Sequence, residues 1–414
     1  MIAAEVRNMK ASWLCEIPSH WDIVRLKTLL KGGTNGAWGS EPKNNKNDIV
    51  CVRVADIDEW QYGISESDLT YRNISETDQN GRLLNYGDLI IEKSGGGEIS
   101  PVGRVVIYNL DKKAVTSNFM ARLNVVGDVN KEFLYYYFRF LYQRRLNHPA
   151  IKATTGIQNL DLYAYLQNPI PIPTSKEQES IVEFINNTSG EITHFIQTKQ
   201  RFIELLKEQR QSIITNAVTK GIDENVKMKA TVLGEIPEHW EVRRLKTLVD
   251  MKSGENITAE SIYQTGEYPV YGGNGLRGFT KTYANEGDFV LIGRQGALCG
   301  NINYASGKFF ASEHAVVVYP KVELDFFWLG ETLRMMNLNQ YSMAAAQPGL
   351  AINNIRVLLV PFPPKNEQKQ IVEHIKFETK TLDIAISKAE REIDLIKEYR
   401  EAMIAEAVTG KMKL

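Results

Sequence analysis

The segment MKASWLCEIPSHWDIVRLKTL at residues 9–29 returns at residues 228–248 as MKATVLGEIPEHWEVRRLKTL. Fourteen of these 21 positions are identical. A second repeat joins residues 177–219 to residues 367–409, which agree at 17 of 43 positions. Internal repeats decide an architecture before any local motif does, so these segments predict two copies of one structural unit.

The sequence between these repeats diverges, and the offset between the copies shrinks along the chain. It is 219 residues at Trp21, 200 at Gly87 and 190 at Glu177. The fall from 219 to 190 makes the second variable block 29 residues shorter, which separate domains with surface loops can absorb. Each copy ends with Ala-Val-Thr shortly before Lys-Met-Lys, at residues 227–229 and 411–413. This predicts a closed two-fold arrangement with the chain's ends near each other.

Composition and charge describe an ordinary globular protein whose 414 residues suit two or three domains. The net charge of −1, from 49 basic and 50 acidic residues, gives no overall field that attracts DNA. No segment reaches the roughly 20 apolar residues of a membrane span, and the N-terminus lacks a signal peptide's apolar core. Cys15, Cys51 and Cys299 lie too far apart for a zinc knuckle or a disulfide framework. We therefore expect a cytoplasmic protein whose nucleic-acid binding, if any, is local or shared with partners.

A long helix is predicted after the Pro-rich strand of each copy. Thr174 and Asn366 offer N-cap side chains just before Glu177 and Glu367. Apolar residues then follow an alternating four-three spacing with a few basic residues among them, which is the pattern of a heptad seam. The seam positions are Ile192, Ile196, Lys199, Ile203, Leu206, Arg210, Ile213 and Ala217, and then Leu382, Ile386, Ala389, Ile393, Ile396, Arg400, Met403 and Ala407.

Two seams of equal length favour pairing of the helices, and the short connection into the second copy makes the pair antiparallel. The alternative is that each helix lies on its own domain. At about 1.5 Å per residue, residues 192–217 span roughly 38 Å. This is close to the separation, about 34–36 Å, of half-sites one DNA turn apart. The helical pair is therefore predicted to act as a ruler, and adding one heptad to this segment should change the preferred gap.

The predicted fold class is a mixed α/β (α+β) protein with a pseudo-two-fold internal repeat. Two globular domains are separated by two long antiparallel helices that form a coiled coil. The predicted boundaries are 9–173 for the first globular domain, 174–220 for the first helical spacer, 228–363 for the second domain and 364–411 for the second spacer. His20-Trp21 and His239-Trp240 recur in the constant frame, so we interpret them as structural anchors of the domain edges.

One glycine-rich segment, Gly273-Asn-Gly-Leu-Arg-Gly278, matches the dinucleotide-binding pattern. A phosphate-binding loop of that kind needs a helix that starts inside the glycines, whereas Phe279-Thr-Lys-Thr-Tyr283 is typical of a strand. We therefore interpret the glycines as a turn between strands that brings Arg277 and Lys281 to a loop tip, where they are predicted to meet phosphate or base edges. The sequence contains no Walker loop, nucleophile elbow, His-Glu-x-x-His or Asn-Pro-Pro-aromatic motif.

Each variable block also contains a Gly-Asp turn, an apolar strand and a polar glycine-rich loop. The loop carries Lys93-Ser94 in the first block and Arg294-Gln295 in the second. Lys and Arg donate to guanine and Gln pairs with adenine in the major groove, so these loops are the predicted sites of sequence readout. Phosphate contacts are predicted at Lys43, Arg53, Arg104 and Lys281. The alternative is an ordinary hairpin turn with solvated basic residues around it.

The chain resembles the specificity subunit of type I restriction-modification systems over its full length. The resemblance is carried by Ile-Pro-x-His-Trp at residues 17–21 and 236–240, the Gly-Asp strand-loop pairs, the segment from Tyr271 to Gly278, and two Pro-x-Pro segments that lead to Glu-Gln at 177–178 and 367–368. It implies a noncatalytic protein whose globular domains are target-recognition domains, each reading one half of a bipartite double-stranded DNA site. Residues 1–8 have no counterpart before Met228.

The same resemblance implies partners and cofactors. Two modification (methyltransferase) subunits with S-adenosylmethionine are expected around the helices, and restriction subunits with ATP and Mg are expected to join them. No cofactor or metal is expected on this chain itself. Two other functions remain open at this stage, a nucleotide-dependent enzyme that uses the Gly273 loop and a coiled-coil scaffold without DNA sequence readout. The residues do not tell us the target sequence or the gap length.

Overall fold

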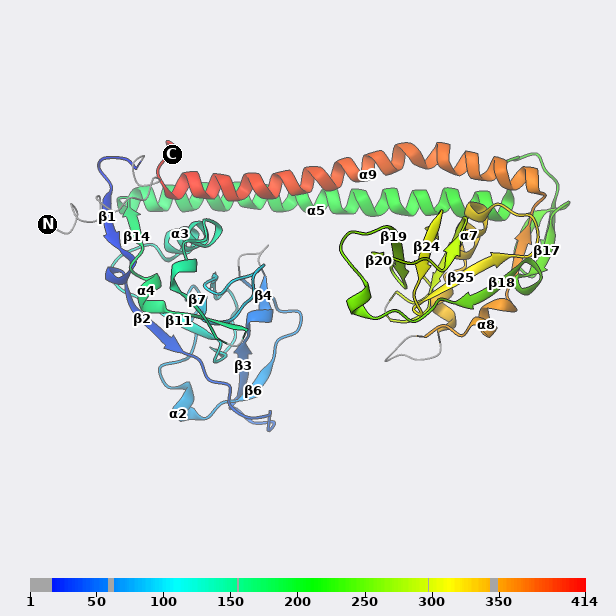
Figure 1. Ribbon diagram of the computed structural model, residues 1–414. Helices are drawn as coiled ribbons and strands as arrows, with labels where there is room; N and C mark the ends of the chain where they lie inside the picture. Colours follow the sequence, from blue (N-terminus) through cyan, green and yellow to red (C-terminus); the bar gives the residue numbers. More distant parts are fainter. Residues whose placement is uncertain (1–16, 59–62, 155, 297, 343–348) are drawn as a thin grey trace. The chain divides into compact units, whose positions relative to one another are not determined.

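The computed structural model describes residues 17–58, 63–154, 156–296, 298–342 and 349–414 (Figure 1). The repeat segment at residues 9–16 and the prefix 1–8 lie outside the described residues. The chain divides into two compact units. The first contains the described residues of Met1–Lys199 together with Arg391–Leu414, and the second contains those of Gln200–Glu390. Each unit is described by itself below, and each includes part of both long helices.

Two of the sheets of the first unit carry the core of its globular part. The four-stranded antiparallel sheet has the order β2-β11-β7-β9, and the three-stranded sheet has the order β10-β3-β6 with β10 parallel to β3. Their bounds are β2 Leu30–Asn35, β3 Asp48–Val52, β6 Tyr71–Asn73, β7 Leu89–Glu92, β9 Val105–Ile107, β10 Ala114–Thr116 and β11 Met120–Val125. Helix α3, Lys131–Gln143, follows β11 and begins at Asn130, whose side chain accepts from the amides of Glu132 and Phe133.

The central strand β7 is buried on both faces, which explains its unbroken apolar run. Leu89 and Ile91 belong to a core cluster that contains the aromatic residues of α3. Ile90 belongs to a second cluster with Val50 and Val52 of β3. Because successive side chains of a strand alternate between its faces, β7 joins the helix layer to the second sheet.

The second unit repeats this topology. Its four-stranded antiparallel sheet has the order β18-β25-β22-β23, and its other sheet has the order β20-β19-β24-β21 with β19 parallel to β24. The bounds are β18 Val249–Ser253, β19 Tyr268–Gly272, β20 Gly275–Thr280, β21 Asn285–Glu286, β22 Phe289–Gly293, β23 Ile302–Ala305, β24 Lys308–Ala311 and β25 Ala315–Pro320. Helix α7, Phe326–Met335, takes the place of α3 and starts at Asp325. The structure thus confirms the predicted duplication and the mixed α/β fold.

Shorter elements complete each globular part. In the first unit they are β1 Asp22–Arg25, β4 Ile57–Asp58, β5 Gly63–Ile64, α2 Glu76–Gln79, β8 Ser94–Gly95, β12 Ile151–Thr154, β13 Ile157–Leu160, α4 Leu162–Tyr165 and β14 Pro169–Ile172. In the second they are β15 Met228–Thr231, β16 Gly234–Pro237, β17 Glu241–Arg244, α6 Leu245–Leu248, α8 Ile352–Arg356 and β26 Leu359–Phe362. In the first unit, β12-β13-β8 forms a further three-stranded sheet. The strand after each His-Trp pair is antiparallel to the Pro-containing strand that precedes the long helix, β1 with β14 and β17 with β26.

The two predicted long helices are present as α5, Ser175–Lys220, and α9, Lys365–Val408. At α5 the predicted capping box forms, since the Glu177 amide donates to Thr174 Oγ1 at 3.4 Å and the Thr174 amide donates to Glu177 Oε2 at 2.9 Å. The prediction for Asn366 is wrong. This residue lies inside α9, which begins one residue earlier, and the position that corresponds to Thr174 is occupied by Pro364, whose carbonyl accepts from the Gln368 amide.

The helices pair in antiparallel register within each unit, as predicted (Figure 1). In the first unit Lys199 Nζ lies 2.6 Å from Glu392 Oε2. In the second unit Lys207 pairs with Glu390 at 3.3 Å and Arg210 with Asp383 at 2.8 Å. All sixteen predicted seam positions are buried or half-buried. The seam is therefore the contact between the two helices rather than a face that each helix lays on its own domain.

Each long helix begins against the His-Trp pair of its own copy. Glu177 Oε1 accepts from His20 Nε2 at 2.7 Å and from Trp21 Nε1 at 3.1 Å. Burial opposes ionisation of this carboxyl group, but hydrogen bonds from His20, Thr174 and Trp21 lower the pKa of Glu177 to about 2. In the second copy His239 Nε2 lies 2.8 Å from Glu367 Oε2. The His-Trp pairs are structural anchors, as the sequence predicts.

The far end of each long helix packs on the frame of the other copy. A Cβ atom on Gly221, just after α5, would lie 3.3 Å from the Trp240 ring. A Cβ atom on Gly410, just after α9, would lie 3.0 Å from the Trp21 ring. Each tryptophan thus receives the end of the helix that started in the other copy.

Two sequence predictions concern the chain's environment. In the part of the chain that the structure describes, no helix is long and apolar enough to cross a membrane. Cys51 and Cys299 are buried free thiols, while Cys15 lies outside the described residues. Burial raises the pKa of the Cys51 thiol to about 11.

Candidate nucleic-acid interface

Lys93 and Ser94 follow the central strand β7 and lie together on a polar surface. Lys93 Nζ donates to Asn35 Oδ1, at the end of β2, over 2.5 Å. Ser94 Oγ donates to Asn159 Oδ1 of β13 over 2.6 Å. Burial of the Lys93 ammonium group lowers its pKa below the ordinary value. A half-buried cation that is held by an amide oxygen keeps donor hydrogens in a defined direction, which suits hydrogen bonding to an acceptor on a base or phosphate.

Arg294 occupies the same place in the second domain as Lys93 in the first. It follows the central strand β22, and its Nη1 donates to Ser253 Oγ at the end of β18 over 3.0 Å. Its amide donates to the carbonyl of His314 over 2.9 Å, as the Lys93 amide donates to the carbonyl of Phe119 over 2.7 Å. The two predicted readout loops therefore occupy equivalent positions in their domains, and each carries a basic side chain at the same place.

Gln295 and the Gly273 turn lie beside Arg294. The Gln295 side chain is exposed, and its Oε1 lies 3.0 Å from His314 Nδ1. A Cβ atom on Gly273 would lie 3.1 Å from the His314 carbonyl and 3.6 Å from that of Gln295. The second domain thus gathers Arg294, Gln295, His314 and the glycine turn on one surface. His314 was not among the residues predicted to contact DNA.

The Gly273 segment is a hairpin turn, as predicted. Strand β19 ends at Gly272 and β20 begins at Gly275, and these two residues are paired. A strand rather than a helix follows the glycines, so the segment lacks the helix N-terminus that a dinucleotide site requires. One detail of the prediction is wrong, because Arg277 lies on β20 and Lys281 follows the far end of that strand. The two basic residues therefore do not share a loop tip.

Arg277 and Lys281 have different surroundings. Arg277 is exposed, and its aliphatic chain lies over Gly272, where a Cβ atom would come within 2.4 Å of Arg277 Cδ. Lys281 is also exposed, with Nζ 5.7 Å from the centre of the Tyr263 ring. Both side chains are accessible, and a role in phosphate or base contact stays a prediction.

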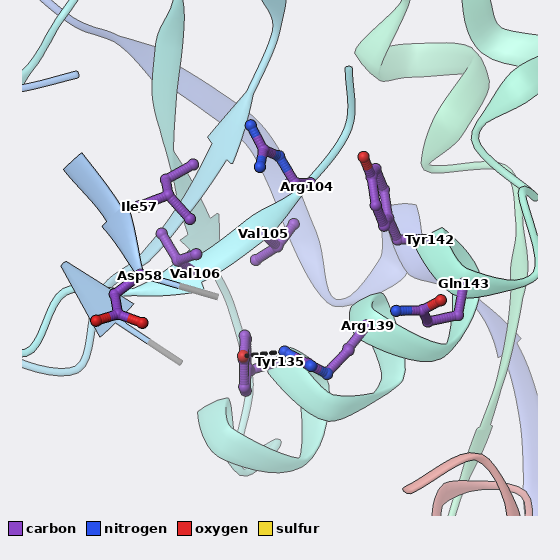
Figure 2. Close-up of a pocket in the computed structure, with 9 residues that line it drawn as sticks. All are labelled: Ile57, Asp58, Arg104, Val105, Val106, Tyr135, Arg139, Tyr142 and Gln143. Atoms are coloured by element: carbon purple, nitrogen blue, oxygen red, sulfur yellow. Dashed lines mark hydrogen bonds between the residues drawn. The ribbon is translucent and has the colours of Figure 1, made fainter. Parts of the chain in front are cut away.

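Arg104 lies near the end of β7, but an acidic partner neutralises its charge. Its Nε donates to Glu92 Oε2 over 2.9 Å, and the Arg104 side chain is only 17% exposed. Arg104 also lines a cavity of about 60 Å³ with Tyr135, Arg139 and Tyr142 (Figure 2). Ligand pockets usually have roughly 300 Å³ or more, so this cavity is too small for a base or a nucleotide. The phosphate contact of Arg104 stays a prediction.

Lys43 and Arg53 lie on other segments of the first domain. The Lys43 amide donates to both carboxylate oxygens of Asp48, at 3.1 and 3.0 Å, and its side chain is exposed. Arg53 Nη2 donates to Asp56 Oδ1 over 2.8 Å, and the Arg53 side chain is 33% exposed. The Arg53 guanidinium is paired locally with an acidic residue, whereas the bond to Asp48 comes from the backbone of Lys43. The phosphate contacts of both residues stay predictions.

The described residues provide no metal-binding chemistry in these domains. No group of three or more His, Cys, Asp and Glu side chains that could hold a metal ion occurs among them. The arrangement that does recur is a basic side chain at the end of a central strand, with polar or aromatic side chains around it. Such a surface can donate and accept hydrogen bonds at the edge of a duplex.

Comparison with known protein families identifies this duplicated architecture. The model for the type I restriction modification DNA specificity domain matches residues 18–205 and again residues 237–393. The chain belongs to this family. As a specificity-domain protein it is a recognition subunit and not a catalytic one. The comparisons lend no support to a scaffold without DNA readout.

Curated members of the family are similar along most of this specificity subunit. The type I restriction enzyme EcoprrI specificity subunit of Escherichia coli is 28% identical over 346 residues, which cover 77% of this chain and 82% of that protein. The putative type I restriction enzyme MjaX specificity subunit of Methanocaldococcus jannaschii is 23% identical over 428 residues, which cover 98% of this chain and 97% of that protein.

A solved structure shares the fold of this specificity subunit. It comes from work on complex assembly and conformational transition of the type I R-M system. The TM-score is 0.69 at 17% identity, with 96% of this chain and 100% of that chain covered. At this identity the match supports the fold alone.

Proposed function

We propose that this protein is the sequence-specific DNA-recognition subunit of a type I restriction-modification complex. Each globular domain reads one half of a bipartite target, and the subunit directs methylation and cleavage by its partners. The observation that carries this proposal is the duplicated readout loop. Lys93 and Arg294 hold the same position and the same backbone bond in two domains whose neighbouring side chains differ.

The partners that we propose are two modification subunits and additional restriction subunits. S-adenosylmethionine, ATP and Mg act on these partners, and the complex works in the cytoplasm. The charge of this chain supports such sharing. With 49 basic and 50 acidic residues it has no surplus of cations, so much of the phosphate neutralisation in the complex comes from elsewhere.

Linkage of the two domains explains how they achieve selectivity although each has only a modest affinity for its own half-site. Once the first domain engages its half-site, binding by the second is intramolecular, and its effective concentration is set by the connection between the domains. The antiparallel ion pairs and the buried seam make that connection stiff over each described part of the helices. Bases between the half-sites go unread.

A binding-site selection on the complex with the modification partner tests this function. The wild-type protein should select two short sequences separated by a constant gap. Replacement of residues 31–165 by the equivalent block of another specificity subunit should change one of these sequences, and replacement of residues 250–355 should change the other. Each variant is the control for the half-site that it leaves unaltered. Selection of a single continuous sequence, or of none, would contradict the proposal.

A further inference from the structure

A turn next to each readout loop has the same backbone in both domains. In the first domain it covers Ser117 to Met120, between β10 and β11, and in the second it covers Ser312 to Ala315, between β24 and β25. The Met120 amide donates to the Ser117 carbonyl over 3.1 Å, and the Ala315 amide donates to the Ser312 carbonyl over 2.9 Å. We call this four-residue segment the serine turn.

Matched contacts fix the serine turn on the sheet. The Ser117 amide donates to the Val52 carbonyl of β3, and the Ser312 amide donates to the Tyr271 carbonyl of β19, each over 2.8 Å. The third residue of the turn then accepts from the readout loop. This residue is Phe119 in the first domain and His314 in the second. The turn is therefore tied to both sheets and to the basic residue that follows the central strand.

A glycine covers the serine turn in both domains. A Cβ atom on Gly36 would lie 1.9 Å from the Thr116 carbonyl oxygen, and one on Gly254 would lie 2.2 Å from that of Ala311. Such distances exclude any side chain, so the backbone passes directly over the turn. The residues before these glycines, Asn35 and Ser253, are the partners of Lys93 and Arg294.

The serine side chain is buried in both turns. Ser117 is 2% and Ser312 is 0% exposed, and among the described residues neither hydroxyl group has a hydrogen-bond partner. An unsatisfied buried hydroxyl is a cost that folds usually avoid. The buried serine hydroxyl group occurs at the same place in two domains whose sequences have diverged, so both domains keep the same local backbone structure.

The two accessible residues of the serine turn differ between the domains, Asn118 and Phe119 in the first and Glu313 and His314 in the second. Phe119 is 51% exposed, although it is a large apolar side chain. The His314 side chain is 43% exposed, and it contacts Gln295 and Glu313. The same backbone thus presents a phenyl ring in one domain and an imidazole in the other. Because this backbone is already fixed, little conformational freedom is lost when its side chain binds.

We propose that Phe119 and His314 are equivalent base-contacting residues and determine specificity in their respective half-sites. This inference rests on the proposed function. Phe119 contacts the C5-methyl group of a thymine in the major groove, where apolar side chains recognise that group. In the other half-site Gln295, whose Oε1 contacts His314 Nδ1, donates from its side-chain amide to a base edge, and His314 Nε2 exchanges its contact with Glu313 for a base acceptor. Lys93 and Arg294 lie beside them as donors to phosphate or guanine.

The test uses the complex of the full chain with its modification partner and a randomised duplex. Phe119→Ala should relax one position of one half-site, where discrimination falls about fourfold, the value of one buried methyl group. Phe119→Leu should retain most of that preference. His314→Ala should relax one position of the other half-site about five- to tenfold. The unaltered half-site in each selection reports that the variant is folded and assembled.

Tyr86 provides a matched control in the first domain. It is an aromatic residue that is 74% exposed, and it precedes β7, at the opposite end of the strand from Lys93. Tyr86→Ala should leave both half-sites unchanged. Equal relaxation by Tyr86→Ala and Phe119→Ala would show that the loss of any exposed ring has this effect, and it would overturn the assignment of Phe119.

Replacement of thymine by uracil at the relaxed position isolates the methyl contact. Wild-type affinity should fall about fourfold, and the Phe119→Ala variant should lose nothing further. The inference would be overturned if the relaxed position contains only G·C pairs. It would also be overturned if neither Phe119→Ala nor His314→Ala changes the half-site that the complex selects. If the wild-type complex selects no bipartite sequence, the proposed function itself fails, and this result differs from all the others.

Discussion

Replacing Glu177 by glutamine tests how the first domain is joined to α5. The carboxylate accepts from His20 and Trp21 through Oε1, and from the Thr174 amide and hydroxyl through Oε2, over 2.7 to 3.1 Å. Glutamine has nearly the same shape but carries no charge, and one of its terminal atoms is a donor. The substitution therefore weakens several of these bonds without opening a cavity.

The pKa of Glu177 sets the expected size of the effect. Its fall from 4.5 to about 2 corresponds to an upper limit of about 3 kcal/mol at roughly 1.4 kcal/mol per pKa unit. The Glu177 side chain is 33% exposed, so solvent screening reduces the expected loss in the free energy of unfolding to about 1–2 kcal/mol. That loss should appear as faster hydrogen exchange at the first turns of α5.

The pH dependence of this effect has a defined sign. A carboxyl group whose pKa is lowered by folding contributes stability above its unfolded pKa, and the contribution is lost as the pH falls through the folded value. The difference in urea midpoint between wild type and Glu177→Gln should be complete at pH 7 and should shrink between about pH 4.5 and 2. A difference that stays constant down to pH 3 would refute the electrostatic origin.

Glu367→Gln is the matched control at the start of α9. A smaller effect is expected there, because Glu367 contacts His239 but Pro364 replaces Thr174 and has neither an amide N–H nor a hydroxyl group to donate.

Two further substitutions test local packing by urea denaturation. Gly36→Ala should destabilise the protein by about 3 kcal/mol, because its Cβ atom would lie 1.9 Å from the Thr116 carbonyl oxygen. Gly97→Ala is the control and should be nearly neutral, because no heavy atom lies within 4 Å of its Cβ position. Equal effects of the two substitutions would contradict the close approach at Gly36. Gly190→Ala should stabilise the protein by about 0.5–1 kcal/mol, since Gly190 lies inside α5 and its Cβ position is open. A loss of stability would show that this position makes a contact that the structure does not contain.

Much of the fold could be predicted from the sequence because the repeats constrain it. The seam positions, the antiparallel pairing and the hairpin at Gly273 all follow from spacing and turn chemistry, which are local properties. The exact start of α9 did not follow, because Asn366 has the side chain of an N-cap although Pro364 precedes the helix at the corresponding position. The domain boundaries inferred from the repeats stay predictions.

The candidate interface was less accessible to sequence reasoning. The equivalent placement of Lys93 and Arg294 could be predicted because each follows a recognisable Gly-Asp strand, and their contact with DNA stays a prediction. Phe119 and His314, which we propose as base-contacting residues, were not among the predicted residues, since the serine turn contains no motif and the two copies align poorly around it. Its signal is the pair of serines that precede Phe119 and His314 by two residues, and this pair becomes visible only when β11 and β25 are superimposed. Arg277 and Lys281 were misplaced because the length of β20 could not be read from its glycines.

A matched insertion in the two long helices tests the central claim most directly. One heptad is added to α5 between Lys199 and Lys207 and another to α9 between Glu390 and Glu392, so that the antiparallel ion pairs on either side can re-form. Seven residues lengthen a helix by about 10 Å, or roughly three base pairs of duplex. A binding-site selection on the complex should return both original half-sites with a gap about three base pairs longer. An unchanged gap would contradict the claim that the paired helices set the spacing between the two readers.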